Sequence, residues 1–127
     1  MAWWGQPKQS APVHVDGPRG SVLVTGLGYK LKDLPRAFGD LGELTESDFE
    51  AVLKPMPPNQ YNRTPIEVWV NGVQIGCVND TSSPAYWGAL RNLKHEVSCT
   101  CVVKTTALRG DYGIQVGKVR LSLPPRL

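Results

Sequence analysis

The feature that most constrains this fold is a hairpin signature in the middle of the chain. Alternating β-branched residues over 66–70 are followed by Asn71-Gly72 and by a second apolar run over 73–78. Asparagine and glycine accept the positive backbone angles of a type I′ turn, whose twist matches that of two paired strands. The segment therefore predicts two adjacent antiparallel strands, and the outward-facing Trp69 is expected to pack across them.

Four further runs of apolar or alternating residues predict strands, and two short stretches predict helices. The strands are expected over 21–27, 48–54, 96–105 and 112–123. A helical turn is expected within 31–38, where Pro35 limits its length, and a second helix is expected to begin near Pro84 after Ser82 or Ser83. The spacing of this second helix predicts packing against the core for Tyr86, Trp87, Leu90 and Leu93. Short strands separated by glycine and proline turns predict a mainly β protein, a small six-stranded antiparallel OB-like barrel with one or two short helices.

The length of 127 residues and a hydrophobic content of 41% are those of one domain with one core. The expected barrel covers residues 20–123. Residues 1–19 hold several prolines and glycines without an apolar period and are expected to form a flexible tail that contains Trp3 and Trp4. Residues 124–127 are expected to form a short C-terminal tail.

The charge and the cysteine content limit the possible partners and the cellular compartment. The formal net charge is +3. Binding of a polyanion is compatible with this charge but would need a local patch of basic residues. No segment has the roughly 20 apolar residues of a membrane span, and none resembles a signal peptide. Three cysteines make a poor disulfide framework, so the chain is expected to be cytoplasmic.

Residues with catalytic chemistry are few and scattered. His14 falls in the expected tail and His95 falls between a helix and a strand. Cys99 and Cys101 alternate on one strand face, which favours core packing over metal binding, and Cys77 has no base nearby in the sequence. We therefore expect a protein that is not an enzyme and that uses no metal and no cofactor.

One family shares several of these motifs in the same order. The loop Asn59-Gln60-Tyr61-Asn62, the hairpin that follows it, and the upstream run Val24-Thr25-Gly26-Leu27-Gly28-Tyr29 together resemble the HIRAN domain family. The helix expected after the hairpin also lies where that family has one. The resemblance covers about residues 20–123, and it implies a modified OB-like barrel of about six strands with two short helices.

The HIRAN resemblance also implies a function. Characterised members bind DNA, prefer single-stranded 3′ ends, and occur beside helicase or nuclease modules, which points to DNA repair. Stacking rings, hydrogen-bonding side chains and positive charge are the expected means of binding. Carried onto this chain, the stacking candidates are Tyr29 and Tyr61, the hydrogen-bonding candidates are Asn59 and Asn62, the cationic candidates are Lys30, Lys32 and Arg63, and Tyr112 is a further aromatic that could close the groove.

The chain departs from the HIRAN pattern at three positions. Asn62 stands where the family has aspartate, Gln60 replaces a proline, and Cys77 replaces an aromatic or histidine residue. These changes bear on selectivity for a 3′ end more than on the fold. Two alternatives stay open: the loop residues serve only the turn and the barrel rim, or the protein is a non-enzymatic interaction adaptor that uses the barrel and the Trp3-Trp4 tail.

Overall fold

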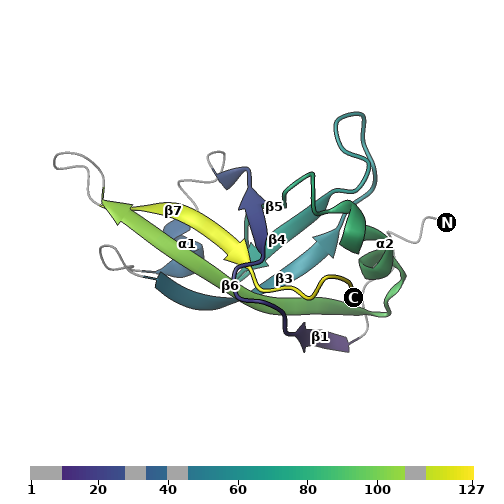
Figure 1. Cartoon of the computed structure of the whole chain (residues 1–127), viewed down its shortest axis with the longest axis horizontal. Coiled ribbons are helices and arrows are strands. Elements are labelled where there is room, and N and C mark those ends of the chain that lie inside the picture. The colour runs from purple at the N-terminus through teal and green to yellow at the C-terminus, as the bar shows by residue number, and fades with distance from the viewer. Residues whose placement is uncertain (1–9, 28–33, 40–45, 108–113) are drawn as a thin grey trace.

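Seven strands and two short helices form the parts of the chain that the structure describes (Figure 1). The computed structural model describes residues 10–27, 34–39, 46–107 and 114–127. The elements are β1 (Ser10–Val15), β2 (Val22–Thr25), α1 (Leu34–Phe38), β3 (Glu46–Pro55), β4 (Ile66–Val70), β5 (Val73–Val78), α2 (Pro84–Asn92), β6 (His95–Ala107) and β7 (Ile114–Leu121). Neither helix among these residues has the length or apolar character needed to cross a membrane.

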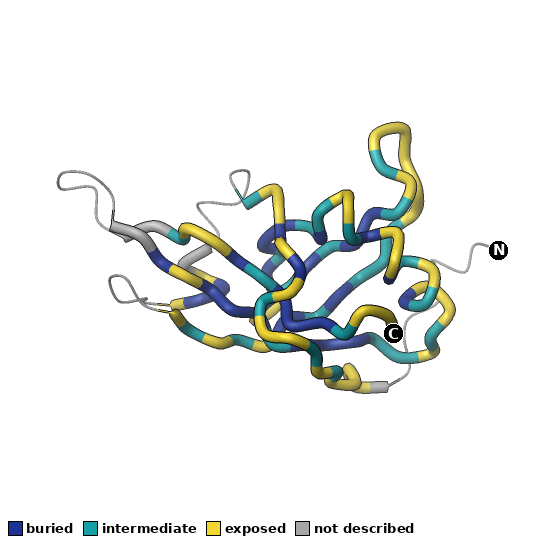
Figure 2. The backbone as a smooth tube through the Cα atoms, in the orientation of Figure 1, coloured by how far each residue is buried: buried dark blue, intermediate teal, exposed yellow. Residues whose placement is uncertain are grey.

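Six of the strands close into an antiparallel barrel, which confirms the predicted fold class. The sheet order is β1-β6-β3-β4-β5-β2-β7, and β7 pairs back onto β6 to close the barrel. β6 is long enough to make this closure, because its thirteen residues pair with β3 over much of their length and with β7 toward the C-terminal end. Figure 2 shows buried backbone along the barrel strands and exposed backbone in the loops that leave it.

The predicted hairpin is confirmed in detail. Asn71 and Gly72 have φ values of 51° and 76°, as a type I′ turn requires. Val68, Val70 and Ile75 lie in the core, with 0–1% of each side chain exposed. The period of two along β4 therefore sets which of its residues face inward, whereas β5 changes phase after Ile75, at the irregularity in its pairing with Val68 and Trp69.

Trp69 packs across strands on the outer face, as predicted. Its residue partner on β3 is Val52, and the Nζ atom of Lys54 lies 4.2 Å from the centroid of its ring. The indole nitrogen donates a hydrogen bond of 3.0 Å to Glu67. Trp69 is thus engaged by its own sheet.

Both helices cover the barrel, and each tolerates its proline in the first turn. In α1, Ala37 and Phe38 are buried, and the Phe38 ring lies 5.0 Å from that of Phe49. In α2, Tyr86 and Leu90 are buried, as predicted from their spacing. Tyr86 donates a hydrogen bond of 2.7 Å to the Pro124 carbonyl, so the residues after β7 pack under this helix.

The tail predicted for residues 1–19 needs correction over residues 10–19. Residues 10–15 form β1, which pairs in parallel with β6. Arg19 then donates to both carboxylate oxygens of Asp48 at 3.0 and 2.9 Å and to Glu46 at 3.3 Å. β1 lies at the sheet edge and its side chains are largely exposed, so its sequence carries no apolar period. Residues 1–9, with Trp3 and Trp4, lie outside the described residues.

The C-terminal tail predicted for residues 124–127 also packs against the fold. Leu127 is partly buried against the core, and the Pro124 carbonyl accepts the Tyr86 bond. A Cβ atom at Gly17 would lie 2.0 Å from the Leu123 carbonyl carbon, so the N-terminal segment crosses directly over the C-terminal one. Both ends of the described chain are therefore tied to the barrel.

Candidate functional site: the loop between β3 and β4

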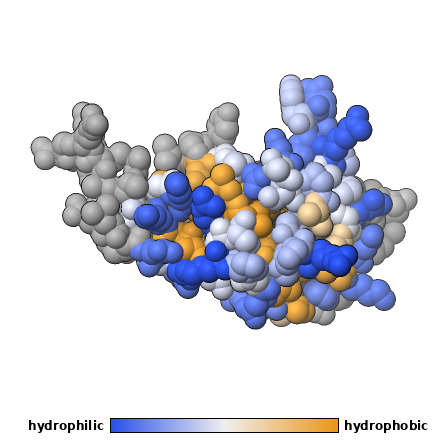
Figure 3. All heavy atoms as spheres, viewed as in Figure 1, coloured by the Kyte–Doolittle hydropathy of each residue, from blue (hydrophilic) through white to orange (hydrophobic). Residues whose placement is uncertain are grey.

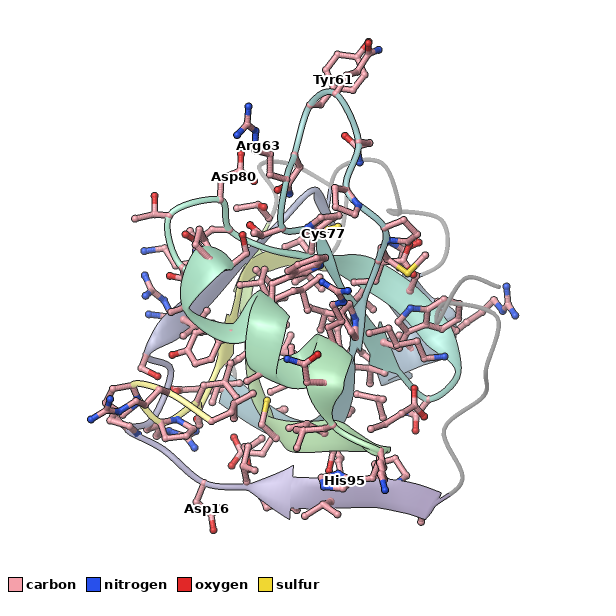
Figure 4. The ribbon with its side chains drawn as sticks, turned by 90° about the vertical axis from the view of Figure 1, so that its right-hand side faces the viewer. Asp16, Tyr61, Arg63, Cys77, Asp80 and His95 are labelled. Atoms are coloured by element: carbon pink, nitrogen blue, oxygen red, sulfur yellow. The ribbon has the colours of Figure 1, made fainter. Side chains whose placement is uncertain are left out.

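The loop of residues 56–65 projects from the barrel between β3 and β4 and carries four of the predicted site residues. Its base is closed by a backbone hydrogen bond of 2.9 Å from Met56 to Pro65, and its tip by one of 2.9 Å from Asn59 to Asn62. Figure 4 shows the loop standing away from the barrel with Tyr61 at its tip. Most of its side chains are hydrophilic, as Figure 3 shows at the upper right.

The Asn59 side chain shapes the tip. Its Oδ1 atom accepts hydrogen bonds from the backbone nitrogens of Tyr61, at 2.8 Å, and Asn62, at 2.9 Å. An amide oxygen has two lone pairs, so both are used inside the loop. A ligand that bonds Asn59 would therefore accept a hydrogen bond from the Nδ2 atom of Asn59. This turn chemistry is the local reason why asparagine suits the position.

Asn62 ties the tip to the connection between β5 and α2. Its Oδ1 accepts from the Thr64 backbone at 2.9 Å, and its Nδ2 donates to Asp80 at 3.3 Å. An aspartate at position 62 could not donate this bond and would place two carboxylates together. Asp80 therefore gives a physical reason for asparagine where the HIRAN pattern has aspartate.

The loop base is anchored by α2 and the turn that precedes it. The Thr64 hydroxyl lies 2.9 Å from the hydroxyl of Ser83, which is completely buried. The indole nitrogen of Trp87 donates a bond of 3.0 Å to the Met56 carbonyl. Sequence reasoning assigned Trp87 to packing and missed this anchor, because no local pattern links residue 87 to residue 56. Together these bonds tie the base of the loop to α2 and to the turn that precedes it.

Tyr61 is the most exposed large hydrophobic residue that the structure describes, with 87% of its surface accessible. Arg63 is exposed two residues further along, and Figure 4 shows both side chains directed away from the barrel. A ring presented on an anchored loop can stack on a planar group, while a guanidinium on the same loop can meet a phosphate.

The other four predicted site residues, Tyr29, Lys30, Lys32 and Tyr112, lie outside the described residues. The structure thus brings together Asn59, Tyr61, Asn62 and Arg63 on one loop. It gives the two asparagines definite roles within that loop, and their contact with nucleic acid stays a prediction.

The cysteines and histidines form no catalytic cluster in the parts of the chain that are described. Cys99 and Cys101 are buried in the barrel, and burial raises the pKa of each thiol to about 12. Both are therefore protonated at neutral pH and are poor nucleophiles. The Nε2 atom of His14 lies 3.1 Å from the Asp16 carboxylate, and the Nδ1 atom of His95 lies 3.0 Å from the carbonyl oxygen of Glu96. No group of three or more metal-ligating side chains occurs among the described residues.

The asparagine-to-aspartate change at position 62 gives a sharp prediction about the loop. We expect Asn62→Asp to loosen the tip, because the new carboxylate faces Asp80. Asp80→Asn in the same chain should restore the link, with the new amide at position 80 as the donor. Backbone amide hydrogen exchange at residues 60–64 measures the effect: faster exchange in the single variant and recovery in the double variant. Equal exchange in all three proteins would contradict the proposed link.

Comparison with family models, with curated proteins and with solved structures finds no match to this chain.

Proposed function

We propose that this protein is a nucleic-acid-binding module that holds single-stranded DNA, with the 3′ end as the preferred element, on the loop of residues 56–65. The observation that carries the proposal is Tyr61, an aromatic ring with 87% of its surface exposed at the tip of an anchored loop. A base stacked on an aromatic ring contributes roughly 1–3 kcal/mol to binding and needs no particular sequence.

Two further features support the proposal. The loop is held by hydrogen bonds from Asn59, Asn62 and Trp87, so little conformational entropy is lost when a base docks. Arg63, two residues further along the loop, adds an exposed positive charge that can meet a phosphate of the bound strand. The order and spacing of motifs that resemble HIRAN domains point the same way. The proposed role is binding rather than catalysis.

The experiment that tests this function is fluorescence anisotropy with labelled single-stranded DNA that carries either a free or a phosphate-blocked 3′ end. We expect binding that weakens as salt rises, and weaker binding when the end is blocked. Binding that ignores the end would leave a general single-strand binder. An absence of binding at low salt would overturn the proposal.

A further inference from the structure

Three basic residues share the outward face of the ribbon formed by β6 and β7. Lys104 on β6 is the direct residue partner of Lys118 on β7, and Arg120 follows two positions after Lys118 on the same face. The residues that alternate with them, Val103 and Val119, are completely buried. Lys104 and Lys118 are exposed and Arg120 is half-buried. We name Lys104, Lys118 and Arg120 the basic strip.

Two carboxylates that the strand register places beside the strip are bound by another cation. Glu46 is the residue partner of Lys104 on the β3 side, and Asp48 is next to it on the same face. Arg19 bonds both, and its hydrogen bonds hold the pKa of Asp48 below its ordinary value. Within the described parts of the chain, the basic strip forms no salt bridge. None of the described carboxylates is therefore paired with the strip.

The pairing of Lys104 with Lys118 does not itself stabilise the ribbon, although Glu46, opposite Lys104 on β3, offsets part of the repulsion. Like charges that face each other directly across an antiparallel pair repel and reduce stability. A register shift between Lys104 and Thr105 marks a bulge beside this pair. A bulge increases the local twist of the sheet and changes the direction in which nearby side chains point. The opposed lysines thus concentrate positive charge on the outward face, where an external anion can neutralise it.

We propose that the basic strip binds backbone phosphates of the same single-stranded DNA whose base stacks on Tyr61. This inference rests on the proposed function and adds a second contact region to it. Single-strand binders combine aromatic platforms with positive surfaces that follow the backbone. Figure 1 shows the β6–β7 ribbon and the loop of residues 56–65 on different sides of the barrel. A bound strand would therefore pass around the barrel, so the strip acts only on oligonucleotides long enough to reach it.

The test is the salt dependence of binding to single-stranded DNA of about 16 and about 4 nucleotides, the range of site sizes known for such barrels. The variant is Lys104→Gln/Lys118→Gln, and the matched control is Lys94→Gln/Arg126→Gln, which removes the same charge elsewhere. Each phosphate contact contributes about 0.7 to the slope of log affinity against log salt. With the longer strand, we expect the strip variant to lower this slope by about 1.4 relative to wild type. With the shorter strand, we expect no change.

Three outcomes separate the two proposals. An unchanged slope in the strip variant, with normal binding by wild type, would overturn the strip and leave the Tyr61 site standing. An equal loss of slope in the control would also overturn the strip, because net charge alone would explain it. If wild type fails to bind at low salt, both proposals fall. Thermal unfolding checks that the variant is folded. Its stability should stay close to that of wild type, because the substitutions remove both the lysine repulsion and the attraction between Lys104 and Glu46.

Discussion

Replacing Tyr61 with alanine should weaken binding to single-stranded DNA by about 5-fold to 160-fold, the equivalent of roughly 1–3 kcal/mol for one stacked base. The ring lies at a loop tip with 87% of its surface exposed, so the fold loses almost nothing with it. The melting temperature should therefore stay within about 2 °C of wild type, since exposed positions of this kind change stability by less than about 0.5 kcal/mol. Anisotropy titrations at one fixed salt concentration measure the affinity.

Conservative variants at the same position separate stacking from other effects. Tyr61→Phe and Tyr61→Trp keep an aromatic face and should retain binding within a few-fold. The slope of affinity against salt should stay unchanged in Tyr61→Ala, because the ring contributes no charge. Full affinity in Tyr61→Ala would remove the main support for the proposed function. Loss of affinity in Tyr61→Phe as well would assign the contact to the hydroxyl group instead of the ring.

Gly76→Ala should lower the free energy of unfolding by about 3 kcal/mol, near the top of the range for overpacked sites. A Cβ atom there would lie 2.4 Å from the Thr25 carbonyl oxygen and 2.9 Å from a methyl carbon of Val24. Both atoms belong to β2, which pairs with β5 at only two positions, Val24 with Val78 and Thr25 with Cys77. Because a backbone carbonyl cannot rotate away as a side chain can, β2 itself would have to shift.

Gly88→Ala is the matched control for this substitution. Gly88 lies within α2, and a Cβ atom built there meets nothing within 4 Å. Alanine should raise stability by about 0.5–1 kcal/mol, because glycine costs that much in a helix interior. Urea unfolding followed by circular dichroism measures both variants through the shift of the midpoint at constant slope. Equal midpoints for the two variants would contradict the close approach of β2 to β5.

Local sequence patterns decided the elements whose residues lie close together in the chain. The Asn71-Gly72 pair set the hairpin, since positive φ at two successive residues is a local requirement. Alternation placed Cys99 and Cys101 in the core, because side chains on a strand point to opposite faces in turn. Helical spacing after Pro84 likewise set which face of α2 is buried. These choices need no knowledge of distant residues.

Only the tertiary structure decided the features that join distant segments. β1 is a strand because the edge of β6 offers it backbone partners, and its own exposed side chains give no apolar period. The Asn62 link to Asp80 and the Trp87 bond to Met56 cross 18 and 31 residues of sequence. The opposed pair of Lys104 and Lys118 exists only through the register of β6 and β7. Sequence periodicity reports which face a residue occupies, whereas the partner across a strand or loop depends on how the barrel closes.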